Sequence, residues 1–170
     1  MQSFEFDHLL NNTESEILDY KECFHDNNAK FIHDILCLAN STPTTNKYLI
    51  FGVRELNGIS SQIIGINNDI HRKNLQQISN MIQSSFFNNV PDYDYIEFQY
   101  NGVLIGILEI KHSEKKPFFL LKDKVDEKTR VRAGVAYSRL GDTNTPIDSC
   151  VDDSSLANMW IVRFRLDNAP

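Results

Sequence analysis

The segment YIEFQYNGVLIGILEIK, residues 95–111, constrains the fold more tightly than any other stretch of the sequence. Asn101 and Gly102 separate two β-rich runs in it. A type I′ turn needs positive φ at both central residues, and Asn followed by Gly adopts that conformation readily. We therefore predict that this segment forms a β-hairpin.

Three further segments have apolar residues at helical spacing. Residues 27–41 predict a helix capped by Asn27 or Asn28, and residues 74–87 predict a helix with one buried stripe. A C-terminal helix is expected within residues 151–166, after a capping aspartate at 152 or 153. The side chains expected to face the core are Leu75, Ile78, Met81, Ile82 and Phe86 in the second helix and Leu156, Met159, Trp160 and Phe164 in the third.

Short apolar runs predict the other strands. Residues 47–55 suit a central strand covered on both faces, and residues 61–66 can pair back on it as a hairpin. Further short strands are expected within residues 117–123 and 129–141. The elements together predict one α+β domain over residues 1–170, a mixed sheet of hairpins with packed helices.

The stretch TESEILDYKEC, residues 13–23, holds four acidic residues and one lysine. The spacing of Thr13 and Glu16 fits a capping box, so a short helical turn is expected before a strand over Ile17–Cys23. So many carboxylates in one element indicate either a solvated edge of the sheet or a group of acids that converge on a cation.

Alternation along that strand separates its polar and apolar side chains. Asp19 and Lys21 share one face, and Leu18 and Tyr20 share the other, so the apolar pair can pack inward while the charged pair faces out. One interpretation is an exposed salt bridge made by Lys21, which contributes no more than about 1 kcal/mol. The other is a contact between Lys21 and a phosphate group.

Composition excludes several classes of protein. With 41% hydrophobic and 24% charged residues, the chain is an ordinary globular sequence. No charged segment followed by an apolar run opens it, and no stretch approaches the roughly 18 apolar residues of a membrane span, so we expect a cytoplasmic protein without a membrane partner. The three cysteines lack C-x-x-C spacing, which indicates neither a disulfide framework nor a zinc site.

The net charge of -6 is unevenly distributed. Residues 1–26 hold seven acids against one lysine, whereas residues 111–139 hold nine basic and four acidic residues. Arginine can bind phosphate with two hydrogen bonds and tyrosine can stack on bases, so the second segment suits contacts with a nucleic-acid backbone. Its candidate residues are Lys115, Lys116, Arg130, Arg132, Tyr137 and Arg139. The alternative is a set of outward side chains on an edge strand.

The order of these pieces resembles that of the Schlafen AlbA_2 domain. The pieces are an acidic E-S-x-x-x-D-Y-K motif, a helix ending LAN, the run YLIFGV, IIGI, the hairpin VLIGILEIK leading into KKPFFL, and VRAGVAYSRLGDTNTP. The resemblance covers about residues 10–164. It implies the fold described above and a domain that is often described as DNA-binding. Members of this family often continue further, so the chain could be the N-terminal part of a longer protein.

The resemblance also implies a possible catalytic site, because nuclease members gather three carboxylates. Two of these map onto Glu14 and Asp19, which would hold Mg²⁺ or Mn²⁺. The third position is Arg54 here, and the next residue, Glu55, would need a bulge in the strand to reach the same site. Arg54 and Lys21 would then contact phosphate. If the site is inactive, Arg54 could take the place of the cation beside Asp19.

Three functions therefore remain open on the sequence alone. The first is a domain that binds RNA or DNA through its phosphate backbone and could form a homo-oligomer. The second is a divalent-metal-dependent endoribonuclease in which Glu14, Asp19 and Glu55 are catalytic. The third is a regulatory protein-interaction module. No cofactor other than Mg²⁺ or Mn²⁺ is implied.

Overall fold

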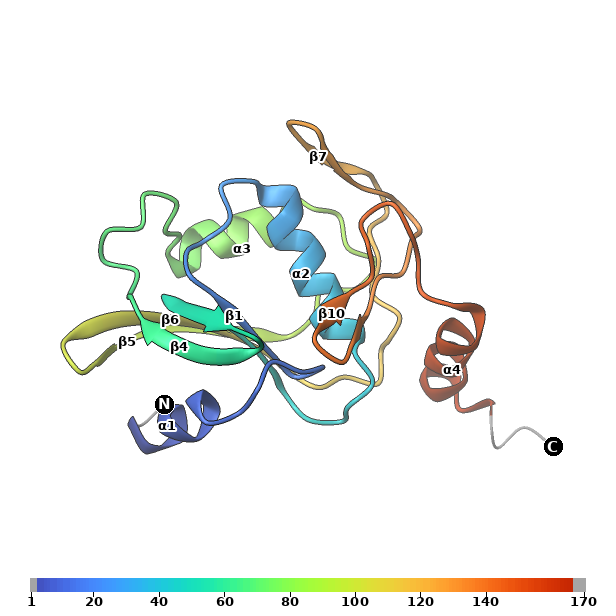
Figure 1. The fold of residues 1–170 in the computed structure, drawn as a ribbon. Helices are drawn as coiled ribbons and strands as arrows, with labels where there is room; N and C mark the ends of the chain where they lie inside the picture. The colour runs from blue at the N-terminus through green and yellow to red at the C-terminus, as the bar shows by residue number, and fades with distance from the viewer. Residues whose placement is uncertain (1–2, 167–170) are drawn as a thin grey trace.

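The computed structural model describes residues 3–166 (Figure 1). Within them the helices are α1 (Ser3–Leu10), α2 (Asn28–Asn40), α3 (Leu75–Gln83) and α4 (Asp153–Phe164). The strands are β1 (Leu18–Lys21), β2 (Lys47–Phe51), β3 (Val53–Leu56), β4 (Ile59–Ile63), β5 (Tyr93–Tyr100), β6 (Val103–Ile110), β7 (Lys124–Asp126), β8 (Thr129–Val131), β9 (Arg139–Leu140) and β10 (Thr143–Asn144). The predicted α+β class is confirmed.

A four-stranded sheet in the order β1-β2-β6-β5 forms the centre of the fold. β1 and β2 are parallel because α2 connects them as a crossover, whereas β2 and β5 each pair with β6 antiparallel. α2 and α3 lie on one face of the sheet and α1 on the other (Figure 1). Each face has its own buried cluster, one that includes Phe31 and Leu36 of α2 and one that includes Phe6 of α1.

The hairpin predicted at Asn101-Gly102 is confirmed. β5 and β6 pair from Tyr93 opposite Ile110 to Tyr100 opposite Val103. Asn101 has φ 49° and Gly102 has φ 81°, so both residues are in the left-handed region that a type I′ turn requires.

The apolar run over residues 47–55 forms two strands, so the single central strand predicted there is wrong. Gly52, with φ 91°, ends β2, and β3 leaves the central sheet to pair with β4. A Cβ atom at Gly52 would lie 2.8 Å from the Cα of Gly65, so only glycine fits where the chain changes sheets. The predicted return hairpin does form, between β3 and β4.

The predicted helix caps are confirmed, but only some of the side chains predicted to face the core are buried. Asn27 caps α2 and accepts a hydrogen bond from Lys30 N, and Asp152 caps α4. In α3 the central apolar residues are buried, but Leu75 and Phe86 are exposed. In α4 only Met159 is buried, because the helix lies at the periphery (Figure 1).

Two further local predictions are wrong. Residues 13–17 form isolated bridges and a turn instead of a helical turn, and Thr13 bridges to Ile59. Residues 117–123 form isolated bridges through Leu120 instead of a regular strand. Strands do occur within residues 129–141, as expected. No helix among the described residues is long and apolar enough to cross a membrane.

Candidate functional site

The acidic motif folds against one side of β1. Leu18 and Tyr20 of β1 pack in the α1 cluster, so Asp19 and Lys21 point toward α2, and the predicted separation of faces is confirmed. Asp19 is buried, however, instead of facing solvent. Glu14 precedes the strand, and its Oε1 accepts a hydrogen bond from Tyr20 N at 2.7 Å. This contact fixes the Glu14 carboxyl beside that of Asp19.

Asp34 of helix α2 and His25, which precedes that helix, belong to this site, and the sequence analysis identified neither. Asp34 is buried on α2, and its Oδ2 lies 3.6 Å from Lys21 Nζ and 2.6 Å from His25 Nε2. Lys21 Nζ also lies 2.8 Å from Asp19 Oδ2, so one ammonium group bridges two carboxylates. The available signal was an aspartate in the middle of the apolar run FIHDIL.

The β9–β10 hairpin brings Arg139 into the same site. The side chain is 3% exposed, and its Nε donates to Ser15 O at 2.7 Å. Its Nη1 lies 3.6 Å from Asp19 Oδ2, and its Nη2 lies 4.0 Å from Glu14 Oε2. Arg139 was predicted to contact nucleic acid from the surface. The structure instead buries it against the acidic motif.

The ionisation of the site follows from these contacts. Burial, together with the neighbouring Asp19 carboxyl, raises the pKa of Glu14 to about 7. Burial alone would raise the pKa of Asp34, but the His25 hydrogen bond and the Lys21 charge hold it below its ordinary value. Burial would likewise lower the pKa of Lys21, but the carboxylates of Asp34 and Asp19 raise it. The site is therefore a buried set of matched charges.

The arrangement does not present three ligands to a divalent metal. Among the described residues, no group of three His, Cys, Asp or Glu side chains is arranged to hold a metal ion. A β-bulge does occur between Arg54 and Glu55, as a third ligand would require. The Glu55 carboxylate nevertheless accepts a hydrogen bond from Gly58 N in the β3–β4 turn. The ammonium of Lys21 and the guanidinium of Arg139 lie against the carboxyls of Asp19 and Glu14.

Arg54 contacts a different acid from the one expected. It is exposed and binds Glu22 with two hydrogen bonds, Nε to Oε2 at 3.0 Å and Nη2 to Oε1 at 2.7 Å. It also donates to Gln62 at 3.1 Å. The cations that lie beside Asp19 are Lys21 and Arg139.

The predicted basic residues separate into surface and buried groups. Lys115 and Arg130 are exposed, and Arg130 pairs with Asp123. Arg132 is partly buried and donates to Ser149 O at 2.7 Å. Lys116 and Tyr137 are buried. The Tyr137 ring packs against His33 with no exposed face, so the predicted stacking surface for a base is wrong.

A sequence model described as "Schlafen, AlbA_2" matches residues 14–148, which run from Glu14 through the β9–β10 hairpin. The chain belongs to the Schlafen AlbA_2 family. The match includes every member of the acidic site and confirms the predicted resemblance.

Solved structures with a similar fold lie at low sequence identity to this Schlafen AlbA_2 chain. The DIP2311 protein from Corynebacterium diphtheriae is 17% identical with a TM-score of 0.50, and the match covers 87% of this chain but only 24% of that protein. The N-terminal domain of a RecG-related protein from Nitrosomonas europaea is 14% identical with a TM-score of 0.49, with coverages of 90% and 96%. The likeness to DIP2311 shows the fold alone. No curated protein matches the chain.

Proposed function

We propose that this Schlafen AlbA_2 domain binds nucleic acid through the basic side chains of the β7–β8 hairpin and its flanks. Lys122, Lys128 and Arg130 are exposed there, and Lys124 is partly exposed. The hairpin projects from the rest of the fold beyond α2 (Figure 1). The observation that supports the proposal most directly is this collection of accessible cations on a projecting element.

Contacts with α2 hold the hairpin in position. Asp126 Oδ2 accepts a hydrogen bond from Asn28 N at 2.7 Å, and Asp126 O accepts one from Asn27 Nδ2 at 2.9 Å. Asp126 is therefore engaged by the helix N-terminus, whereas Glu127 in the turn is exposed. Arg130 pairs with Asp123, but Arg130 is exposed, so exchange of this partner for a phosphate costs little.

An aromatic side chain lies next to one of these cations, Lys122. Lys122 Nζ lies 4.4 Å from the centre of the Phe86 ring, and Phe86 is 52% exposed. An exposed ring beside a lysine suits a base stacked next to a bound phosphate backbone. Phe86, instead of the buried Tyr137, is the aromatic residue that this surface offers.

The test is a salt titration of binding to single-stranded and duplex RNA and DNA. Lys122→Glu combined with Lys128→Glu should weaken binding about tenfold or more and make its salt dependence shallower, because fewer counterions are released. Glu127→Lys on the same turn should strengthen binding. Arg165→Glu, at the exposed end of α4, is the control and should change the affinity less than about twofold. Unchanged affinity and slope in the double variant would reject the proposal.

A metal-dependent endoribonuclease is the second candidate, supported by the adjacent carboxyls of Glu14 and Asp19. A divalent ion would need to displace Lys21 or Arg139 from these acids. We expect a live nuclease to bind Mn²⁺ in calorimetry, to cleave structured RNA until EDTA is added, and to lose cleavage in Asp19→Asn with its fold intact. If the wild type neither binds Mn²⁺ nor cleaves RNA, the nuclease candidate is excluded. A regulatory protein-interaction module would show no salt-dependent affinity for any oligonucleotide.

A further inference from the structure

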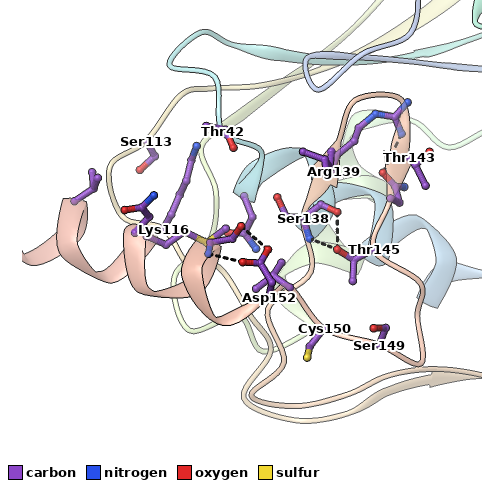
Figure 2. A pocket seen from close by; sticks show the side chains of 18 of the residues that line it. Thr42, Ser113, Lys116, Ser138, Arg139, Thr143, Thr145, Ser149, Cys150 and Asp152 are labelled. Atoms are coloured by element: carbon purple, nitrogen blue, oxygen red, sulfur yellow. Dashed lines mark hydrogen bonds between the residues drawn. The ribbon is translucent and has the colours of Figure 1, made fainter.

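A cavity of about 790 Å³ lies between α4, the β9–β10 hairpin and the loops that follow α2 and β6. Figure 2 shows the Lys116 side chain extending toward Thr42 and Ser113, with Ser149 and Cys150 at the other side of the view. Lys116 is 8% exposed. The cavity shares Arg139 with the acidic site, but Arg139 and Lys116 are well separated in Figure 2. Its volume is typical of a small-molecule site.

Two buried lysines meet at the Thr42 side of this cavity. Lys116 Nζ donates to Ser41 O, and Lys47, which is fully buried behind the same loop, donates to Pro43 O at 2.7 Å. Among the described residues, no salt bridge joins either ammonium group to a carboxylate. Burial, and for Lys47 also the neighbouring Lys116, lowers the pKa of each lysine to about 8.

His112 adds a third basic group to the same wall. It lines the cavity, and its buried Nδ1 atom has no hydrogen-bond partner among the described residues. Burial, followed by the charges of Lys47 and Lys116, lowers its pKa. A buried nitrogen without a partner is costly unless a ligand or water completes its hydrogen bond.

Protein groups compensate only part of this positive charge. Ser41 is the C-cap of α2, and a helix C-terminus provides roughly half a negative charge. The acids that act on the cluster, Glu16 on Lys116 and Glu114 on His112, do so from beyond ion-pair distance. Asp152 also lines the cavity, but Ser155 N and Ser155 Oγ occupy its carboxylate at 2.9 and 2.6 Å. Buried charges are normally paired, and this pair of lysines is not.

We propose that the cavity binds a phosphomonoester whose dianionic phosphate is held by Lys116, the hydroxyls of Thr42 and Ser113, and the imidazole of His112. The apolar side chains of α4 that line the cavity, Met159 and Val162, would cover the remainder of the ligand. The site is separate from the β7–β8 surface and does not depend on the proposed nucleic-acid binding. Lys47 supplies charge from behind the loop without touching the ligand.

The first experiment titrates the full chain with inorganic phosphate at constant ionic strength, against chloride, by calorimetry and by NMR of the His112 imidazole. We expect saturable binding that shifts the His112 signals. Lys116→Met should weaken binding about tenfold or more, the loss expected for one charge-assisted hydrogen bond. The adjacent, exposed Lys115→Met is the matched control and should change affinity less than about twofold. Equal losses in both variants, or no saturable binding, would overturn the proposal.

A second variant keeps the test decisive if Lys116→Met does not fold. Thr42→Val combined with Ser113→Ala removes both hydroxyls but leaves the lysines in place, and it should weaken phosphate binding severalfold. Unchanged affinity in that folded double variant would overturn the proposal equally.

Further titrations identify the source of the phosphate. Ribose 5-phosphate bound more tightly than inorganic phosphate would indicate a small-molecule ligand, and Val162→Trp should then weaken ribose 5-phosphate more than inorganic phosphate. A 5′-phosphorylated oligonucleotide bound more tightly than its 5′-hydroxyl counterpart would indicate the end of a strand. If no phosphomonoester binds more tightly than inorganic phosphate, the assignment of the ligand class is wrong.

Discussion

The two buried charge clusters of this domain differ in how their charges are compensated. In the acidic site, Lys21 bridges Asp19 and Asp34, and Arg139 lies against Asp19, so acids and cations are matched within the fold. Beside the cavity, the ammonium groups of Lys47 and Lys116 donate to backbone carbonyls and form no ion pair with any residue that the structure describes. A matched cluster therefore needs nothing from outside to be stable, whereas an unmatched one is stabilised by a ligand of opposite charge.

The largest expected effect comes from breaking the matched cluster. Asp34→Ala should lower the free energy of unfolding by about 3 kcal/mol or more, because it removes the buried partner of His25 and one of the two carboxylates that Lys21 bridges. Chemical denaturation with an unchanged m-value measures it. Asp26→Ala, at an exposed position nearby, should have little effect. If Asp34→Ala and Asp26→Ala lower the free energy of unfolding equally, the buried ion pairs of Asp34 do not stabilise the fold.

Loss of charge at Lys47 and Lys116 should raise the free energy of unfolding, whereas loss of the Asp34 charge should lower it. Their pKa values of about 8 lie below the ordinary value of 10.5, so the folded state binds fewer protons than the unfolded state between these limits. The penalty is fully present below pH 8 and is relieved as the pH rises. Between pH 7.5 and 9.5 the wild type should gain about 2 kcal/mol more stability than Lys116→Met. If the free energies of unfolding of the wild type and Lys116→Met change in parallel with pH, this prediction is wrong.

A smaller effect is expected within the acidic site itself. The pKa of Glu14 is raised to about 7 from 4.5, so its folded state binds more protons between these values. The stability contribution is fully present below pH 4.5 and is lost as the pH rises through 7. Relative to Glu14→Gln, which keeps an acceptor for Tyr20 N, the wild type should lose about 1 kcal/mol over this interval, less than the full pKa shift corresponds to, because solvent screens this partly exposed carboxyl. Urea unfolding at several pH values provides the measurement.

The smallest effect is expected for the exposed pair of Arg54 and Glu22. Both side chains are about half exposed, and solvent and salt screen the interaction. Arg54→Ala should leave the melting temperature unchanged within error and should not alter Mn²⁺ titrations. A clear loss of stability would show that Arg54, which stands where nuclease members of the family have their third carboxylate, contributes to the stability of the fold.

Sequence patterns predicted those parts of the fold that depend on neighbouring residues. The Asn101-Gly102 hairpin and the caps at Asn27 and Asp152 rest on local backbone conformation, and all three are confirmed. The break at Gly52 was not predicted, because its cause is a close approach to Gly65 across the β3–β4 hairpin. Sequence spacing alone does not reveal such a long-range contact.

The candidate site shows the same division. Glu14 and Asp19 were predicted to lie together, and Tyr20 N holds one beside the other. Asp34 was missed because helical periodicity identifies a buried face without saying which buried position has a charged partner. Arg139 and Tyr137 were predicted at the surface on residue type, but burial depends on how residues 133–145 pack against β1 and α2.

Arg139 connects the acidic site near the start of the sequence with the β9–β10 hairpin near its end. Its guanidinium donates to Ser15 O, which is 124 residues away in the sequence. During synthesis, Glu14, Asp19 and Asp34 emerge from the ribosome long before this counter-charge exists. A nascent chain that stops before residue 139 would therefore carry three acids with only Lys21 and His25 to neutralise them. The arginine thus makes completion of the acidic site a late event, and only a chain that has folded through the β9–β10 hairpin would have the site in its final state.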